Sequence, residues 1–270
     1  MRIIAFGAHP DDCDVKVGGT AALWVRQGDT VKFVSVTNGD AGHHEIGGVE
    51  LARRRKEEAT AAGQVIGVTY QVLDIHDGEL EPTLANRRRI IEIIRDFRPD
   101  LVLSPRPNDY HPDHRYTATL VQDAAYMVTV PNIAAHTPHL RSNPCICYFS
   151  DHFLRPYPFS PDVVVGIDEV LALKLDMLHC HVSQMYEWLP YNGQHEQDVP
   201  ADDAGRRRWL EPRRAAGSRD IADRYRSLLL ERYGPERGQA IEHAEAFELC
   251  EYGARPTAER LSRLFPLAGN

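Results

Sequence analysis

The sequence has few cysteines, no long apolar run and no excess of basic charge. Its five cysteines are an odd number without a Cys-x-x-Cys pair, so we expect reduced thiols instead of a disulfide framework. No apolar run approaches the ~20 residues of a membrane span, and no basic-then-apolar leader precedes the first apolar segment; together these predict a cytoplasmic protein. The net charge of −8 argues against a nucleic-acid partner.

Short apolar segments that alternate with helical patterns are abundant. Of the 270 residues, 43% are hydrophobic, which suffices for a sizeable core. The alternation is typical of βαβ units and predicts an α/β fold, with a mostly parallel sheet and helices on both faces. The predicted strands are residues 3–7, 31–36, 70–73 and 101–104, and the predicted helices are residues 20–26, 48–66, 83–97 and 112–128.

Later segments have fewer regular patterns, and we expect them to form a loop-rich cap over the cleft. Residues 163–165 are predicted to be a strand, followed by a helix over about 168–186. Residues 192–218 are predicted to be an extended, charged loop or lid, and residues 244–252 an edge strand or a covering segment. We predict a single domain, with its sheet-building core at about 1–130 and 162–190 and its cap at about 131–161 and 191–270.

Two clusters of histidine and aspartate follow predicted strands. His9-Pro10-Asp11-Asp12 comes directly after the first strand, and His111-Pro112-Asp113-His114 comes soon after the fourth. Because open α/β sheets bind ligands beyond the carboxyl ends of their strands, both clusters should lie at one edge of the sheet. Taken separately, either cluster could be no more than a turn or a helix cap.

Together, the clusters could hold a catalytic metal ion. Zinc in hydrolases commonly has three imidazole or carboxylate ligands and an open position for water, and His9, Asp12 and His114 would supply that set. Asp11 would then lie beside the metal-bound water and take its proton as the water attacks an acyl carbon. His111 would stabilise the oxyanion or protonate the departing amine, and Asp113 would orient a histidine. This arrangement predicts amide hydrolysis.

The two clusters resemble those of the PIG-L (LmbE-like) family of zinc-dependent deacetylases, which act on N-acetylglucosamine-type sugars and related conjugates. Other segments resemble the family as well: Thr37-Asn38-Gly39-Asp40, Arg55-Lys56-Glu57-Glu58-Ala59, and Lys174 with His181-Val182-Ser183-Gln184. The resemblance implies a Rossmann-like sheet and one Zn²⁺ or another divalent ion. By position it implies the metal ligands His9, Asp12 and His114, the base Asp11, the proton donor His111, and sugar contacts at Arg55 and Asp77.

The sequence departs from the family pattern at two places. Cys13 stands where the family often has glutamate after the Asp-Asp pair, which affects the surroundings of the metal site but not the three ligands. Some relatives have a tyrosine two residues before the first histidine of the second cluster, where this chain has Asp109. Tyr110 is one place off, so we do not assign it a role in polarising the substrate carbonyl.

Further histidines, cysteines and aromatic residues have both a functional and a structural interpretation. His43-His44 could line the cleft, although a solvent-facing loop is favoured. Cys145 and Cys147 are expected to pack in a strand instead of binding a second metal. Trp188 and Trp209 could stack on a sugar, but core positions are favoured for both.

We therefore predict a metal-dependent N-deacetylase that acts on a small N-acetylated sugar or glycoconjugate. One alternative is an amidase that cuts a larger acyl or thiol conjugate with the same metal site. Another is a non-catalytic sugar- or nucleotide-binding module, although no G-x-G-x-x-G or P-loop pattern follows the first strand. The expected partner is a small molecule, with no nucleic acid and no membrane span, and a homo-oligomer is a possible assembly.

Overall fold

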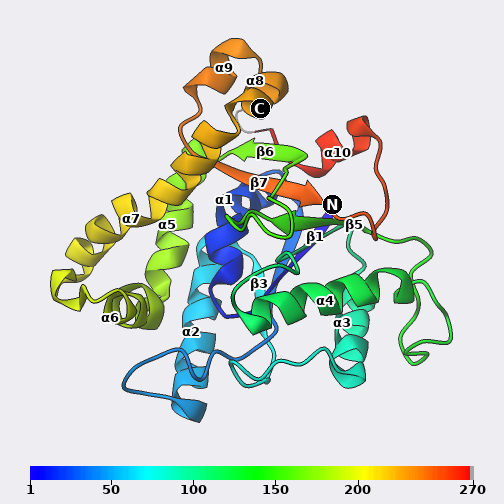
Figure 1. Cartoon of the computed structure of the whole chain (residues 1–270), viewed down its shortest axis with the longest axis horizontal. Helices are drawn as coiled ribbons and strands as arrows, with labels where there is room; N and C mark the ends of the chain where they lie inside the picture. Colours follow the sequence, from blue (N-terminus) through cyan, green and yellow to red (C-terminus); the bar gives the residue numbers. More distant parts are fainter. Residues whose placement is uncertain (268–270) are drawn as a thin grey trace.

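The computed structural model describes residues 1–267 and is built on a seven-stranded sheet (Figure 1). The strands are β1 (Arg2–Gly7), β2 (Thr30–Ser35), β3 (Thr69–Val72), β4 (Leu101–Ser104), β5 (Cys145–Phe149), β6 (Val163–Gly166) and β7 (Ala244–Leu249). Their spatial order is β3-β2-β1-β4-β5-β7-β6. Neighbours from β3 to β5 are parallel, and β7 is antiparallel to both β5 and β6. The predicted α/β fold with a mostly parallel sheet is confirmed.

Helices lie on both faces of the sheet (Figure 1). The first in the chain are α1 (Asp12–Arg26), α2 (Gly48–Ile66), α3 (Leu84–Phe97) and α4 (Pro112–Met127), and α5 (Leu171–Cys180) packs on α1 and α2. Alternate side chains of a strand point to opposite faces. Accordingly, Ile3 and Ala5 of β1 pack with α1, α2 and α5, whereas Ile4 and Phe6 pack with α3 and α4. Burial on both faces explains why β1 is an unbroken apolar run.

The alignment of β1 with β4 brings the two His/Asp clusters together. These strands are parallel, and Ala5 of β1 pairs with Leu103 of β4. The chain therefore leaves both strands at the same edge of the sheet, as the sequence predicted. His9 lies in the short turn before α1, and His111 is the residue that precedes α4.

The later half contains more regular structure than we expected. The prediction of an extended loop over 192–218 is wrong, because α7 spans Asp203–Arg224. This helix is highly charged and buries few apolar side chains, such as Leu210 and Ala222, so its apolar periodicity is weak. Its start is fixed by the side chain of Asp202, which accepts a hydrogen bond from the N–H of Gly205 at 2.8 Å. The other helices of this half are α6 (Leu189–Asn192), α8 (Arg226–Tyr233), α9 (Pro235–Ala240) and α10 (Ala258–Leu264).

Two segments assigned to the cap belong to the sheet. β5 pairs with β4, and β7 lies between β5 and β6, so β7 is an inner strand and not an edge strand. β5 is a short apolar run and β7 alternates apolar residues with glutamates. Both gain their ladder partners only from distant parts of the chain, which local patterns cannot reveal.

The helix predicted over about 168–186 is divided after Cys180. α5 ends there, and Ser183–Trp188 forms a π-helical segment. The carboxylate of Glu58 accepts hydrogen bonds from the N–H and the hydroxyl of Ser183, at 2.9 and 2.6 Å. Side-chain bonds of this kind compete with the regular helical pattern, and they fix Gln184 near the cleft.

All five cysteines are free thiols, as expected, and four are buried. Cys145 and Cys147 pack within the core on one face of β5, which confirms the packing interpretation. Within residues 1–267, no helix has the length and apolar character needed to cross a membrane.

Candidate metal centre

Three donor atoms from the two clusters form a compact triangle at the sheet edge. His9 Nδ1 lies 3.6 Å from Asp12 Oδ2 and 3.3 Å from His114 Nε2, and the last two atoms are 3.5 Å apart. Ligands of a tetrahedral zinc ion at 2.0–2.1 Å stand about 3.3 Å from one another. Two imidazole nitrogens and a carboxylate oxygen at these spacings therefore fit a divalent cation.

The ring nitrogens on the far side of the two histidines face carboxylates. His9 Nε2 lies 3.1 Å from Asp77 and 3.4 Å from Asp113. His114 Nδ1 lies 3.1 Å from Asp109. In metal sites such partners fix the proton on the far nitrogen and leave the near nitrogen free to bind the ion.

Asp109 is a residue that the sequence reasoning did not use in this way. We noted it only as a departure from the family pattern, yet its carboxylate contacts His114 and also accepts the N–H of His111 at 2.9 Å. The sequence signal was a carboxylate two residues before the second cluster, which is common in turns. Only the folded loop shows what Asp109 contacts.

The electrostatics of the triangle favour a positive charge. Burial raises the pKa of Asp12, but the imidazoles of His114 and His9 and a backbone N–H outweigh it and hold this pKa far below its usual range. Burial lowers the pKa of His9, but its carboxylate neighbours raise it well above the ordinary value. The same balance of burial against Asp12 and Asp109 raises the pKa of His114. A site in which Asp12 stays ionised and the histidines favour positive charge suits a bound cation.

A second set of donors converges close by. His9, Asp77, His111 and Asp113 offer ligand atoms within 4.8 Å of one another, and so do His9, His111 and His114. His9 is shared by all of these sets. The ligand assignment to His9, Asp12 and His114 therefore stays a prediction that a metal-bound structure can test.

Asp11 lies beside the triangle without belonging to it. Its Oδ1 is 3.3 Å from Nη2 of Arg55, whose side chain is 3% exposed. Nη1 of Arg55 donates to the carbonyl of Gly39 at 3.1 Å and lies 3.6 Å from Asp77. Gly39 has a positive φ of 72°, and a Cβ there would lie 2.5 Å from the guanidinium, so this turn needs glycine.

A cavity of about 490 Å³ opens next to these residues and is hereafter called the metal cavity. It is lined by His9, Asp11, Asp12, Ala41, Gly42, Arg55, Asp77, Gly78, Tyr110, His111, His114, Gln184, Trp188, Leu189 and Asn192. Arg55 and Asp77 thus border the space expected for substrate, but each also contacts the protein: Arg55 contacts Gly39 and Asp11, and Asp77 contacts His9. Sugar contact by Arg55 and Asp77 remains a prediction.

The aromatic residues divide between the cavity and the core. Trp188 lines the metal cavity, contrary to the core position that we favoured. Trp209 is partly buried against Leu210 and Tyr186 and also lines a separate cavity, so its expected core position is confirmed only in part. Tyr110 lines the cavity and is 74% exposed, with its ring in edge contact with His111.

His43 is more buried than expected. Its side chain is 3% exposed, and its Nε2 lies 2.9 Å from Glu187, so a solvent-facing position is wrong for this residue. The partner comes from the distant π-helical segment and has no local sequence signal. His44 stacks on Tyr191, with ring centroids 4.0 Å apart.

His111 and Asp113, from the second cluster, also accept backbone hydrogen bonds that fix the local chain. His111 Nδ1 accepts the N–H of Asp113 at 3.2 Å and so caps α4. The carboxylate of Asp113 accepts N–H groups of Gly78 and Leu80, at 2.7 and 3.3 Å. Asp113 therefore ties the loop that carries Asp77 to the start of α4.

The fold and the site define an α/β protein with a candidate His/Asp metal site in an open cleft. Residues 4–125 match the family model described as PIG-L, GlcNAc-PI de-N-acetylase. A diacetylchitobiose deacetylase from Thermococcus kodakarensis is 33% identical over 207 residues, which cover 70% of this chain and 74% of that protein. The chain belongs to the PIG-L family.

Two further comparisons show how widely the fold is used. A solved N,N'-diacetylchitobiose deacetylase from Pyrococcus horikoshii superposes with a TM-score of 0.71 at 23% identity, covering 96% of this chain and 88% of that one. A 4-oxalmesaconate hydratase from Pseudomonas putida is 24% identical over 196 residues, covering 70% of this chain and 76% of that protein. Relatives thus include proteins named for different reactions, and the reaction has to be argued from the site.

Proposed function

We propose that this protein is a metal-dependent N-deacetylase that hydrolyses the acetamide of a small amino sugar or glycoconjugate. The observation that carries the proposal is the triangle of His9, Asp12 and His114 with Asp11 beside it in the metal cavity. The deacetylases among the relatives support it.

Zn²⁺ is the expected cation, held by His9, Asp12 and His114, and when bound it would polarise the substrate carbonyl and lower the pKa of water. Asp11 is the base that removes a proton from the attacking water, because its carboxylate lines the cavity and is not a member of the triangle. Arg55 fixes the orientation of Asp11 through the 3.3 Å contact.

His111 is placed to donate a hydrogen bond on the substrate side. Its Nδ1 accepts the backbone N–H of Asp113, so in the neutral ring the proton resides on Nε2. Burial and the charges of His9 and His114 lower the pKa of His111, which favours the neutral ring. Nε2–H can then donate a hydrogen bond to the oxyanion, while the proton that Asp11 takes from the water passes on to the departing amine.

The size of the metal cavity favours a small substrate over a larger conjugate. Its volume of about 490 Å³ is in the range of sites for small molecules, and Trp188 offers an aromatic surface for a sugar ring. An amidase for bulky acyl or thiol conjugates would use the same polar groups but would need a longer cleft.

The proposal is tested by measuring acetate release from N-acetylglucosamine and diacetylchitobiose by the zinc-loaded protein. We expect stoichiometric acetate and free amine, and loss of both products after treatment with a chelator. Sugar binding without acetate release would support the non-catalytic module and contradict the proposal.

A further inference from the structure

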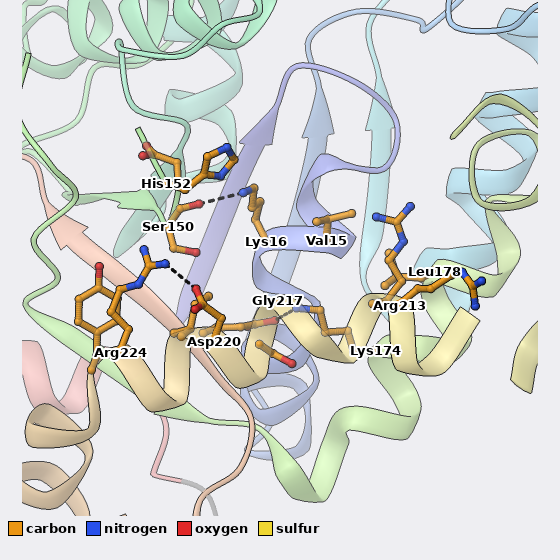
Figure 2. A pocket seen from close by; sticks show the side chains of 16 residues that line it. Val15, Lys16, Ser150, His152, Lys174, Leu178, Arg213, Gly217, Asp220 and Arg224 are labelled. Carbon is orange, nitrogen blue, oxygen red and sulfur yellow. Dashed lines mark hydrogen bonds and ion pairs between the residues drawn. The ribbon is translucent and has the colours of Figure 1, made fainter. Parts of the chain in front are cut away.

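A second cavity of about 240 Å³, hereafter called the basic cavity, lies between α1, α5 and α7 (Figure 2). Figure 2 shows Lys16 extending from α1 toward Ser150, and Arg213 and Arg224 on α7. The chain after β5 and the side chain of Glu245 on β7 complete the walls. None of the residues assigned to the metal site or to substrate contact lines this space.

The basic cavity carries more positive than negative charge. Its acidic residues are already paired: Asp151 with Arg106 at 2.6 Å, Asp220 with Arg224 at 2.7 Å, and Glu245 with Lys174 at 2.6 Å. In each pair the charge of the carboxylate is already balanced. These carboxylates therefore do not pair with the other basic residues of the wall.

Three cations of the wall lack such a partner. Within the part of the chain that the structure describes, Lys16, Arg213 and Arg214 form no ion pair with a carboxylate. Lys16 Nζ donates to the backbone carbonyl of Ser150 at 2.9 Å, and Arg213 donates to the carbonyl of Trp209 at 3.1 Å. Burial lowers the pKa of Arg214 and Lys16 is partly buried, so a bound anion would compensate partly buried positive charge.

The basic cavity adjoins the candidate metal centre. Lys16, Ser150 and Asp151 also line a small cavity of about 20 Å³. The walls of that small cavity include Asp12 and His114, which belong to the triangle. An anion in the basic cavity would therefore lie one layer of side chains away from the reacting centre.

We propose that the basic cavity is a binding site for a small carboxylate, held by Arg213 and Arg214 on α7, with Lys16 on the opposite side of the cavity. Arginine and lysine around a carboxylate form charge-assisted hydrogen bonds, and the volume admits a group larger than acetate. The source of the carboxylate is the acid released by hydrolysis or a carboxylate substituent of the substrate. The origin of the carboxylate rests on the proposed deacetylase function. Binding of a carboxylate does not, because it needs no turnover.

The binding is tested by NMR titration of isotope-labelled acetate into the full-length protein after removal of metal, so that acetate cannot bind through the ion. We expect saturable binding that Arg214→Gln and Arg213→Gln each weaken by about tenfold. Arg208→Gln, an exposed change on the same helix, is the matched control and should leave the affinity unchanged. Absence of saturable binding, or equal affinity in all variants, would overturn the proposal, and failure to detect deacetylation would not.

A kinetic comparison separates the two sources. If the substrate brings the carboxylate, Arg214→Gln lowers kcat/KM for N-acetylmuramic acid and not for N-acetylglucosamine. If hydrolysis releases it, Arg214→Gln weakens inhibition by added acetate with both substrates. Either result supports the site. If Arg214→Gln changes neither quantity, the basic cavity has no role beside the active centre.

Discussion

The metal cavity and the basic cavity are neighbours with opposite charge. The metal cavity presents the carboxylates of Asp11, Asp12 and Asp77, which suit a cation. The basic cavity has its carboxylates neutralised by ion pairs and retains Lys16, Arg213 and Arg214. The difference is one of charge preference: one space is suited to a divalent cation, and the other to an anion.

The two cavities also differ in how the chain builds them. The donors of the metal cavity lie in short turns after parallel strands, where two clusters of adjacent residues meet. The basic cavity instead takes single residues from helix faces that are far apart in the sequence. A motif can reveal the first kind of site, whereas the second appears only after the helices have packed.

The largest expected effect is that of His114→Ala, which removes a corner of the triangle. We expect zinc content to fall from about one equivalent to near zero, and kcat/KM to fall by more than ~1000-fold, because the activation supplied by a cation is worth several kcal/mol. Metal analysis and acetate release measure the two effects. His44→Ala, which changes a histidine outside the metal cavity, is the control; equal zinc content in both variants would contradict the assignment.

Asp11→Asn should separate chemistry from metal binding. The amide keeps the size of the carboxylate but cannot take a proton from water, so we expect kcat to fall by about 100-fold to 10,000-fold. Zinc content should stay at the wild-type level, because Asp11 is not one of the three ligands. Turnover at the wild-type rate would remove Asp11 from the role of base.

Lys174→Met tests whether the ion pairs of the basic cavity are structural. Lys174 pairs with Glu245, whose carboxylate is buried and also accepts the N–H groups of Gly19 and Thr20. Without the cation, the buried carboxylate of Glu245 has no opposite charge. The free energy of unfolding should therefore fall by about 3 kcal/mol in a urea titration. Lys56→Met, an exposed change on α2, is the control; a loss below about 1 kcal/mol for Lys174→Met would show that Glu245 does not need the cation.

The smallest of these effects is expected for Asp109→Asn. The change weakens the support of His114 without removing a ligand, so zinc affinity should fall by about 10- to 100-fold in a competition titration. Asp123→Asn, which alters an exposed carboxylate on α4, should leave the affinity unchanged. Equal affinities in both variants would show that Asp109 does not position His114.

The sequence predicted the parts of the molecule whose pattern is local. β1 to α4 have apolar residues at strand or helix spacing, and the clusters around His9 and His111 follow directly from the strand ends. α7 was missed because charged residues hide its few buried positions. The roles of Asp109 and His43 were missed because each depends on a partner that the folded loops supply, and the inner position of β7 depends on long-range pairing.

Anomalous diffraction at the zinc edge from crystals of the zinc-loaded protein would locate the ion and its ligands. We expect one ion bound by His9 Nδ1, Asp12 and His114 Nε2, with Asp11 outside the coordination sphere. An ion held instead by Asp77, His111 and Asp113, or no ion at the ends of β1 and β4, would contradict this expectation.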